Sequence, residues 1–358
     1  MSASTPSPTA SATGWPTSGP RTGPCSPPPA SRRSCEAFER SRLVTDATNG
    51  RRWGLTIPFD NVPLHEQKQW ISDVVAAGYT DLWSSEAGGT DGFTPLALAS
   101  QWAPSARLGV AIIPAFTRGP GLMAMSVAAM AETAPGRFAF GVGTSSDVIV
   151  QRWNGIPFDE PYKRTRDMVR FLRKALTGDK VDEQYDTFTV KGFRLGRPPE
   201  VQPPILVGAL RPGMLRLAGR EGDGAIINWL SADDVKQVVP HVGEGKEVVA
   251  RIFVCPSEDA DAVRNLGRYA ISAYLNVPVY KAFHEWLGRG DDLGGMWEGK
   301  AAVAAIPDRV VDDLVVHGSP AECRAHVQRY VDNGVTTPAL AIFPLGDARQ
   351  AALDLAPH

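Results

Sequence analysis

The sequence has few of the features that assign a function at once. Its 358 residues carry a formal net charge of −2, so no excess of either sign indicates a nucleic-acid or anionic-membrane partner. No apolar run reaches the roughly 18–20 residues that a membrane-spanning helix needs. The four cysteines are widely spaced and include no C-x-x-C pair. This usage predicts reduced thiols and a cytoplasmic protein.

Several signatures of catalytic chemistry are also missing. The six histidines form no H-x-x-x-H or H-E-x-x-H pattern, so we expect no metal site. No G-x-S-x-G elbow supplies a serine nucleophile. The spacing Gly141-x-Gly143-x-x-Ser146 lacks the third glycine of the dinucleotide fingerprint, and no Gly-Lys-Ser/Thr follows it as in a P-loop. What remains fits a planar organic cofactor with a phosphate tail better than a metal or a covalent nucleophile.

The first fifty residues differ in composition from the rest of the chain. Residues 1–50 are rich in Pro, Ser, Thr, Ala and Arg and contain almost no aliphatic side chains. Such a segment buries too little apolar surface to offset its ordering entropy, so we expect a disordered tail. It has no apolar core of 7–15 residues, which argues against a secretory signal. An organelle transit peptide and an over-long predicted start both remain open.

From residue 51 onward, apolar strands alternate with helical patterns. Each predicted strand except the last is followed by a helical pattern. Strict alternation with strands that are apolar on both sides predicts a parallel sheet. Eight such units in about 300 residues favour a single (β/α)8 TIM barrel with insertions over an open doubly wound sheet. The predicted strands are 52–59, 80–85, 108–115, 137–143, 205–208, 224–229, 248–255 and 339–343.

The predicted barrel domain covers residues 51–346, and residues 347–358 are predicted as a C-terminal tail. Two stretches interrupt the alternation. Residues 185–193 suggest a hairpin-like insertion, and residues 260–310 are mostly helical with a Gly-rich break at 288–299.

Barrel enzymes carry their sites on the loops that follow the strands. Here these loops are aromatic and rich in hydroxyls, with Glu86 and Asp91 as an acidic pair. Four aromatic side chains are predicted to form an apolar wall, which implies a hydrophobic or aromatic substrate. They are Trp53, Phe116, Trp153 and Trp229.

Six stretches, in this order, resemble the bacterial luciferase-like family, in the actinobacterial branch that uses the deazaflavin coenzyme F-420. Together they span most of residues 51–345. They are LWSSEAGGTDGFTPL (82–96), LGVAIIPAFTRGP (108–120), GVGTSSDVIVQRWNGIPF (141–158), LVGALRPGMLRLAG (206–219), LNVPVYKAFHEWLG (275–288) and HGSPAEC (317–323).

The resemblance implies a set of cofactor contacts. A bulge with a non-prolyl cis peptide at Ala111–Ile112 is expected to back the deazaflavin ring. Ser85 and Glu86 match positions beside the ring edge and the reaction centre. The linker contacts are expected at Gly143, Thr144 and Ser145, and the phosphate cradle at Gly208, Ala209, Leu210 and Arg211. The resemblance also implies a homodimer.

One position departs from the family pattern. The sugar-phosphate dehydrogenases of this family have a glutamate where this chain has Ser146, and no basic residues for a sugar phosphate are evident. We therefore expect a different substrate, with Glu86 as first and Asp91 as second candidate for the general acid or base.

The leading prediction is an F-420-dependent oxidoreductase that moves a hydride between C5 of the cofactor and a small, hydrophobic organic substrate. A two-component monooxygenase that uses reduced FMN and a non-catalytic cofactor-binding relative are the alternatives.

Overall fold

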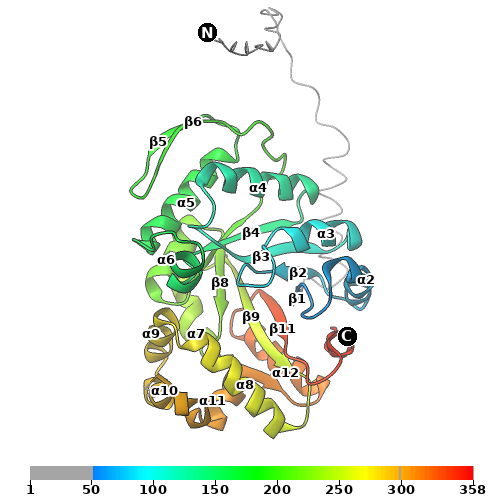
Figure 1. Cartoon of the computed structure of the whole chain (residues 1–358). Helices are drawn as coiled ribbons and strands as arrows, with labels where there is room; N and C mark the ends of the chain where they lie inside the picture. The colour runs from blue at the N-terminus through cyan, green and yellow to red at the C-terminus, as the bar shows by residue number, and fades with distance from the viewer. Residues whose placement is uncertain (1–50, 298–299, 358) are drawn as a thin grey trace, which may run out of the picture.

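The computed structural model describes residues 51–297 and 300–357, and parallel strands form a closed ring at its centre (Figure 1). The predicted tail at residues 1–50 lies outside the described residues. The ring closes because β9 pairs with both β8 and β11. In ring order the strands are β1 (Gly54–Thr56), β2 (Asp81–Ser84), β3 (Arg107–Pro114), β4 (Phe138–Gly143), β7 (Ile205–Gly208), β8 (Gly224–Asn228), β9 (Glu247–Cys255) and β11 (Thr337–Ile342).

The predicted TIM barrel is therefore confirmed, and the open doubly wound sheet is excluded. All eight predicted strands take part in the ring. Their boundaries differ in places: β1 is limited to Gly54–Thr56, whereas the sequence suggested 52–59.

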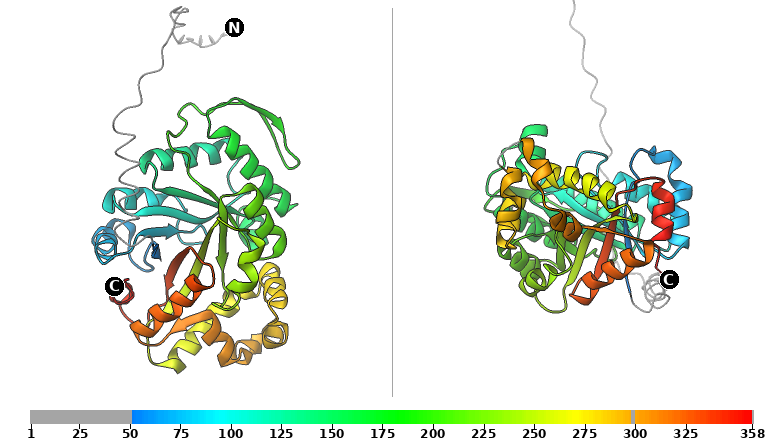
Figure 2. Two further views of the ribbon diagram at one scale, coloured as in Figure 1. Left: turned by 180° about the vertical axis from the view of Figure 1, so that it is seen from behind. Right: turned by 90° about the horizontal axis from the view of Figure 1, so that it is seen from below.

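Helices surround the ring (Figure 2). The amphipathic pattern of these helices explains why they pack against the strands. In α5, Met168, Phe171 and Leu172 are buried on one face while the basic residues lie on the other. Helix α12 begins at a capping box between Ser319 and Glu322. The helices between barrel strands are α2 (Lys68–Ala76), α3 (Thr94–Trp102), α4 (Pro120–Thr133), α5 (Pro161–Ala175), α6 (Pro212–Glu221), α7 (Val235–Val238) and α12 (Pro320–Asp332).

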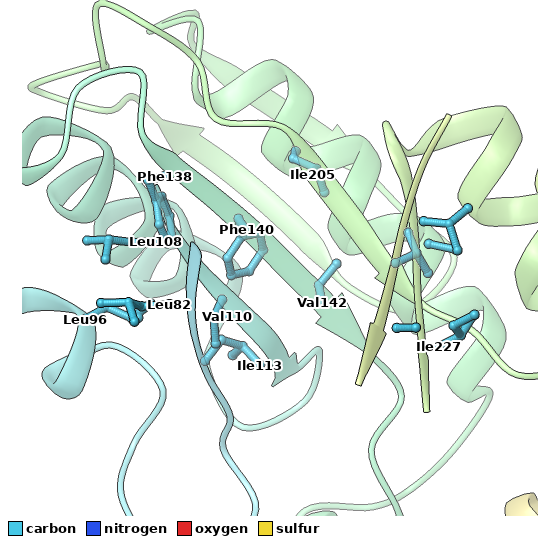
Figure 3. Close-up of a cluster of buried hydrophobic side chains, with 14 of the residues drawn as sticks. Leu82, Leu96, Leu108, Val110, Ile113, Phe138, Phe140, Val142, Ile205 and Ile227 are labelled. Atoms are coloured by element: carbon cyan, nitrogen blue, oxygen red, sulfur yellow. The ribbon is translucent and has the colours of Figure 1, made fainter. Parts of the chain in front are cut away.

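Alternate residues of each strand pack into two separate layers. Figure 3 shows the outer layer, where Leu82, Leu108 and Phe138 of the strands lie near Leu96 of α3. The inner layer fills the ring and consists of Trp83, Ala139, Leu206, Ile226, Val249 and Ala339. The barrel is therefore a packed core, and only its ends are available for a ligand.

The amino-terminal end of the ring is closed by buried charges. Arg107 donates from Nη1 and Nη2 to the two oxygens of Glu247, at 2.6 and 2.8 Å. Its Nη1 also lies 3.3 Å from Oδ1 of Asp81, whose side chain is fully buried. Arg52 reaches the same carboxylate at 3.2 Å. Because these groups satisfy one another, the opposite end of the ring is the place for a site.

Two insertions interrupt the barrel. A hairpin is present but begins earlier than predicted, because β5 (Val181–Gln184) precedes the expected residues 185–193 and β6 (Thr189–Phe193) lies within them. The predicted helical stretch after β9 contains α8 (Ala260–Leu275), α9 (Pro278–Trp286), α10 (Gly290–Trp297) and α11 (Asp308–Leu314).

The predicted Gly-rich break at 288–299 is wrong for most of its length. Helix α10 forms there because Leu293 and Met296 are buried against the neighbouring helices.

Three elements were not predicted. The short strand β10 (Val315–His317) pairs with the end of β9 outside the ring. A π-helix covers Val148–Trp153, where the sequence suggested a loop. Helix α13 (Ala348–Asp354) lies within the predicted C-terminal tail.

The C-terminal segment is held by two side chains of the barrel domain. The Tyr79 hydroxyl donates to the carbonyl of Ala352 at 2.9 Å. Nε1 of Trp53 donates to the carbonyl of Leu355 at 3.1 Å. Trp53 directly precedes β1 and therefore lies at the amino-terminal end of the ring, so its predicted place in a substrate wall is wrong.

Candidate functional site

A hollow opens to solvent at the carboxyl end of the ring. Its volume of about 10 Å³ is room for about one water molecule and is far below the ~300–1,000 Å³ of pockets for drug-sized ligands. A ring system would therefore lie across the rim above this hollow. The hollow is lined by Thr56, Trp83, Ser84, Ser85, Ala111, Val249, Arg251 and Ala339.

One wall of this hollow carries the backbone feature that the resemblance implied. The peptide bond between Ala111 and Ile112 is cis and non-prolyl, as predicted. The pairing of β3 with β4 shifts in register between Val110 and Ile113, so the predicted bulge is present too. Ala111 lines the hollow directly.

Glycines on the adjoining strands let the β3 wall lie close to them. A Cβ atom at Gly208 would lie 3.1 Å from Cγ2 of Ile112, and one at Gly143 would lie 3.3 Å from the same side chain. A Cβ at Gly141 would lie 2.1 Å from the carbonyl oxygen of Val110. These strand ends therefore form a smooth floor that side chains would disrupt.

The loop that follows β7 leads into the amino terminus of α6. Arg211 is the N-cap residue, and no side chain caps the first turn of this ten-residue helix. A Cβ at Gly213 would meet nothing within 4 Å, so the first turn is open. The N–H of Ala209 is occupied, since it donates to the carbonyl of Ile226 at 2.9 Å. An anion at this helix end would therefore use the N–H groups that follow Ala209.

The loop after β4 is tightly turned. Ser145 has a positive φ of 61°, and the Thr144 hydroxyl donates to its carbonyl at 3.2 Å. Ser146 accepts from the N–H groups of Val150 and Ile149 at the start of the π-helix. The residue that replaces the family's glutamate thus serves as a local backbone anchor.

Glu86 is held by an ion pair at the rim. Both of its oxygens accept from Nη1 of Arg118 at 2.7 Å. Oε2 also accepts from the N–H of Gly92 at 3.1 Å. Arg118 in turn lies over the ring of Phe93, 5.0 Å from its centroid. The carboxylate is therefore fixed in position by a residue that sequence analysis did not pair with it.

Asp91, the second acid–base candidate, organises the start of α3. Its Oδ1 accepts from the N–H groups of Phe93 at 2.9 Å and Thr94 at 3.1 Å. Burial alone would raise the pKa of Asp91. The hydrogen bonds from Thr94 and Phe93 and the charge of Arg118 outweigh it and hold this pKa below its usual value.

The side chains that were predicted to form an aromatic wall differ in burial and in the residues they contact. Trp153 ends the π-helix, and 59% of its surface is exposed. Its indole covers Gly88, where a Cβ would lie 3.3 Å from the ring. Phe116 is buried against Phe158, with ring centroids 5.2 Å apart. Of these side chains, Trp153 is the one that overhangs the rim.

Trp229 is buried in a second aromatic cluster beside the mouth. Its ring stacks on Phe253 at a centroid distance of 3.8 Å, and Tyr274 lies 5.4 Å away. It follows β8 with a positive φ of 54°.

Sequence analysis missed two polar residues at the mouth. Thr56 and Arg251 line the hollow, and Arg251 pairs in register with Asn228 at the end of β8. Nδ2 of Asn228 donates to the Tyr280 hydroxyl of α9 at 2.9 Å. A signal was present for Arg251, because it is a single charge within the apolar strand VVARIFVC.

Within residues 51–297 and 300–357, no group of three or more His, Cys, Asp or Glu side chains is arranged to hold a metal ion. Over the same range, no helix combines the length and the apolar character needed to cross a membrane.

Sequence comparison assigns the family. The family model described as luciferase-like monooxygenase matches residues 45–337. The chain belongs to the luciferase-like monooxygenase family. The resemblance inferred from the six sequence stretches is therefore confirmed.

Curated relatives in this family are reductases and dehydrogenases. The chain is 25% identical over 302 residues to a 5,10-methylenetetrahydromethanopterin reductase of Methanolobus tindarius, covering 78% of this chain and 90% of the relative. It is 27% identical over 257 residues to an F-420-dependent glucose-6-phosphate dehydrogenase of Rhodococcus hoagii, covering 70% and 76%.

Solved structures share the fold. An F-420-dependent secondary alcohol dehydrogenase in complex with an F-420–acetone adduct has a TM-score of 0.71 at 16% identity, covering 85% of this chain and 96% of that one. The oxygenating constituent of 3,6-diketocamphane monooxygenase from Pseudomonas putida, in complex with FMN, has a TM-score of 0.59 at 15% identity, covering 86% and 97%. At these identities the likeness concerns the fold alone.

Proposed function

We propose that this protein is a coenzyme F-420-dependent oxidoreductase that moves a hydride between the deazaflavin and a small organic substrate with a hydrophobic body. The observation that carries the proposal is the floor without side chains at the carboxyl end of the ring, where Gly143 and Gly208 lie against Ile112 beside the bulge in β3. Relatives described as F-420-dependent support the choice of cofactor.

The residues at the mouth fit a flat ring system. The backbone at Ala111 and Ile112 would back the ring, and the glycine floor at Gly143 and Gly208 would keep side chains away from it. Close approach of backbone to a ligand is a common use of glycine. Ser85 lines the hollow and would contact the ring edge.

The rim fits a phosphate tail. The open first turn of α6 would hold the phosphate, with the backbone of Gly208, Leu210 and Arg211 beside it, and Ala209 would serve to position this loop. Thr144 and Ser145 would contact the linker between ring and phosphate.

When bound, coenzyme F-420 supplies a two-electron hydride carrier. The chain's own contribution is to position the substrate and to exclude water. Trp153 would cover the substrate side of the mouth, with Phe116 and Trp229 supporting the walls from within the core. We keep Glu86 and Asp91 as the groups that would exchange a proton with the substrate, with Arg118 as the positioning residue for Glu86.

We further propose a cytoplasmic homodimer, which the family resemblance and the reduced cysteines support. Light scattering of the purified full chain tests the oligomeric state, and a monomer would contradict that part.

The cofactor assignment is tested by equilibrium titration of the purified protein with F-420 and with FMN. We expect F-420 to bind with micromolar or better affinity and FMN to bind much more weakly. Gly208→Ala is expected to weaken F-420 binding at least about tenfold, because the new Cβ would lie 3.1 Å from Ile112 and displace the side chain that is proposed to back the ring. The matched control is Gly196→Ala, which meets nothing within 4 Å and should leave affinity unchanged.

Two outcomes would replace the proposal by its alternatives. Tighter binding of FMN, together with oxygen-dependent turnover, would make the protein a flavin monooxygenase. Normal F-420 binding with no hydride exchange at C5 against a broad substrate panel would make it a non-catalytic relative.

A further inference from the structure

An arginine at the mouth, Arg251, has no carboxylate partner among the described residues. Arg251 comes from β9 and lines the hollow. Its register neighbours are Asn228 on β8 and Ala339 on β11. Counted around the ring, β9 lies opposite β3. Arg251 therefore faces the cis peptide wall at Ala111 from across the hollow.

Other partly buried arginines of the barrel have partners within the described residues. Arg107 is paired with Glu247, Arg118 with Glu86 and Arg289 with Asp234. Arg137 and Arg164 have no ion pair there, but they donate to backbone carbonyls. Arg251 makes no ion pair or side-chain hydrogen bond with any residue in the described ranges, and its Nε atom is buried without a partner. A cation withdrawn from water without a counter-charge is unfavourable unless a ligand supplies one.

Its surroundings fix the orientation of the guanidinium group. The group lies over the ring of Phe253, 4.9 Å from the centroid. Phe253 is itself stacked on Trp229. A guanidinium group placed over an aromatic ring keeps its N–H fork available for a planar oxyanion.

Other polar atoms at the same place are also unused. Thr56 Oγ1, from the lining of the hollow, and Asn228 Oδ1 are buried without a hydrogen-bond partner among the described residues. Buried polar atoms are normally satisfied, so several together beside one cation indicate a polar ligand group.

We propose that Arg251 binds a carboxylate of the substrate, so that the substrate class is organic acids with an apolar or aromatic body. This rests on the proposed function, because a deazaflavin ring placed over Ala111 leaves the β9 side of the mouth for the substrate. The aromatic cluster of Trp229, Phe253 and Tyr274 then lies beside the apolar body.

The test compares benzoate with its neutral, planar analogue benzamide. Each is titrated into the protein saturated with F-420 and into the protein alone, followed by tryptophan fluorescence. We expect benzoate to bind at least about tenfold tighter than benzamide, since it alone supplies the counter-charge. Arg251→Met should abolish this preference by weakening benzoate while leaving benzamide unchanged.

Two further variants keep the result interpretable. Arg194→Met removes an exposed arginine of the hairpin region and should change neither ligand. Arg251→Lys retains the charge without the planar fork, and we expect an intermediate benzoate affinity. If Arg251→Met does not fold, Arg251→Lys is the test. In that case, benzoate binding by Arg251→Lys that equals the wild type would overturn the proposal.

Several results would contradict the assignment of Arg251. Equal affinities for benzoate and benzamide in the wild type would do so, as would a benzoate affinity that Arg251→Met leaves intact. A larger loss of F-420 than of benzoate in that variant would place Arg251 against the cofactor instead. Failure of F-420 to bind the wild type would refute the cofactor assignment separately, because the titration without F-420 still measures the anion preference.

Discussion

Removing Arg107 should destabilise the closed end of the barrel more than removing an ordinary surface cation. In Arg107→Met, Glu247 keeps only the Thr337 hydroxyl at 3.1 Å, and the fully buried Asp81 keeps only Arg52 and the Thr80 hydroxyl. Leaving a buried charge without its partner costs about 3–5 kcal/mol. We expect about 3 kcal/mol, the lower end, because the Glu247 side chain is 20% exposed.

The effect should also depend on pH. Burial alone would raise the pKa of Glu247, but the hydrogen bonds and charge of Arg107 outweigh it and lower that pKa. A carboxyl with a lowered folded-state pKa contributes stability above its unfolded value of about 4.3. That contribution is lost as the pH falls through the folded-state pKa. The difference between wild type and Arg107→Met should therefore be full at pH 7 and shrink below about pH 4.

The assay is urea denaturation at a series of pH values, with unfolding followed by tryptophan fluorescence. Arg173→Met is the matched control, because its ion pair with Asp223 is more than a third exposed on both sides. That control should cost at most about 1 kcal/mol. A loss below about 1 kcal/mol for Arg107→Met, or a loss that does not change between pH 7 and pH 3, would refute this reasoning.

Two further substitutions probe the barrel interior and the rim. Gly109→Ala places a Cβ 2.3 Å from the Trp83 ring inside the barrel, so we expect about 1–3 kcal/mol of destabilisation in urea, whereas Gly196→Ala should be nearly neutral; equal stability of the two variants would show that the interior is not packed as described. Asp91→Ala removes the carboxylate that accepts from Phe93 and Thr94 at the start of α3 and should cost about 1 kcal/mol at pH 7. Because the pKa of Asp91 is lowered, this cost should fall as the solution is acidified through that pKa, and a cost independent of pH would contradict the assigned hydrogen bonds.

The barrel was predictable because its strands are apolar on both faces and each is followed by a helical pattern. The cis peptide at Ala111–Ile112 was predicted only from the resemblance to a family, since nothing local in LGVAIIP distinguishes it from an ordinary strand.

The short elements were less accessible to sequence analysis. Helix α10 has two adjacent glycines, yet Leu293 and Met296 bury enough apolar surface for a helix to form there. Strand β10 has three residues, too few to show an alternating pattern.

The contacts of charged residues at the rim could not be predicted, because they join residues that are distant in sequence. Glu86 was identified as a candidate acid or base, but its ion pair with Arg118, 32 residues away, follows only from the fold. Arg251 is a single charge in an apolar strand, and its position opposite Ala111 requires the ring to be closed.

The most direct measurement is a crystal structure of the protein with F-420 bound. The account predicts the deazaflavin ring across the mouth, above the hollow, with one face against Ala111–Ile112 and the phosphate at the first turn of α6. A ring bound elsewhere, or bound with Arg251 in place of the cis peptide at its back face, would contradict it.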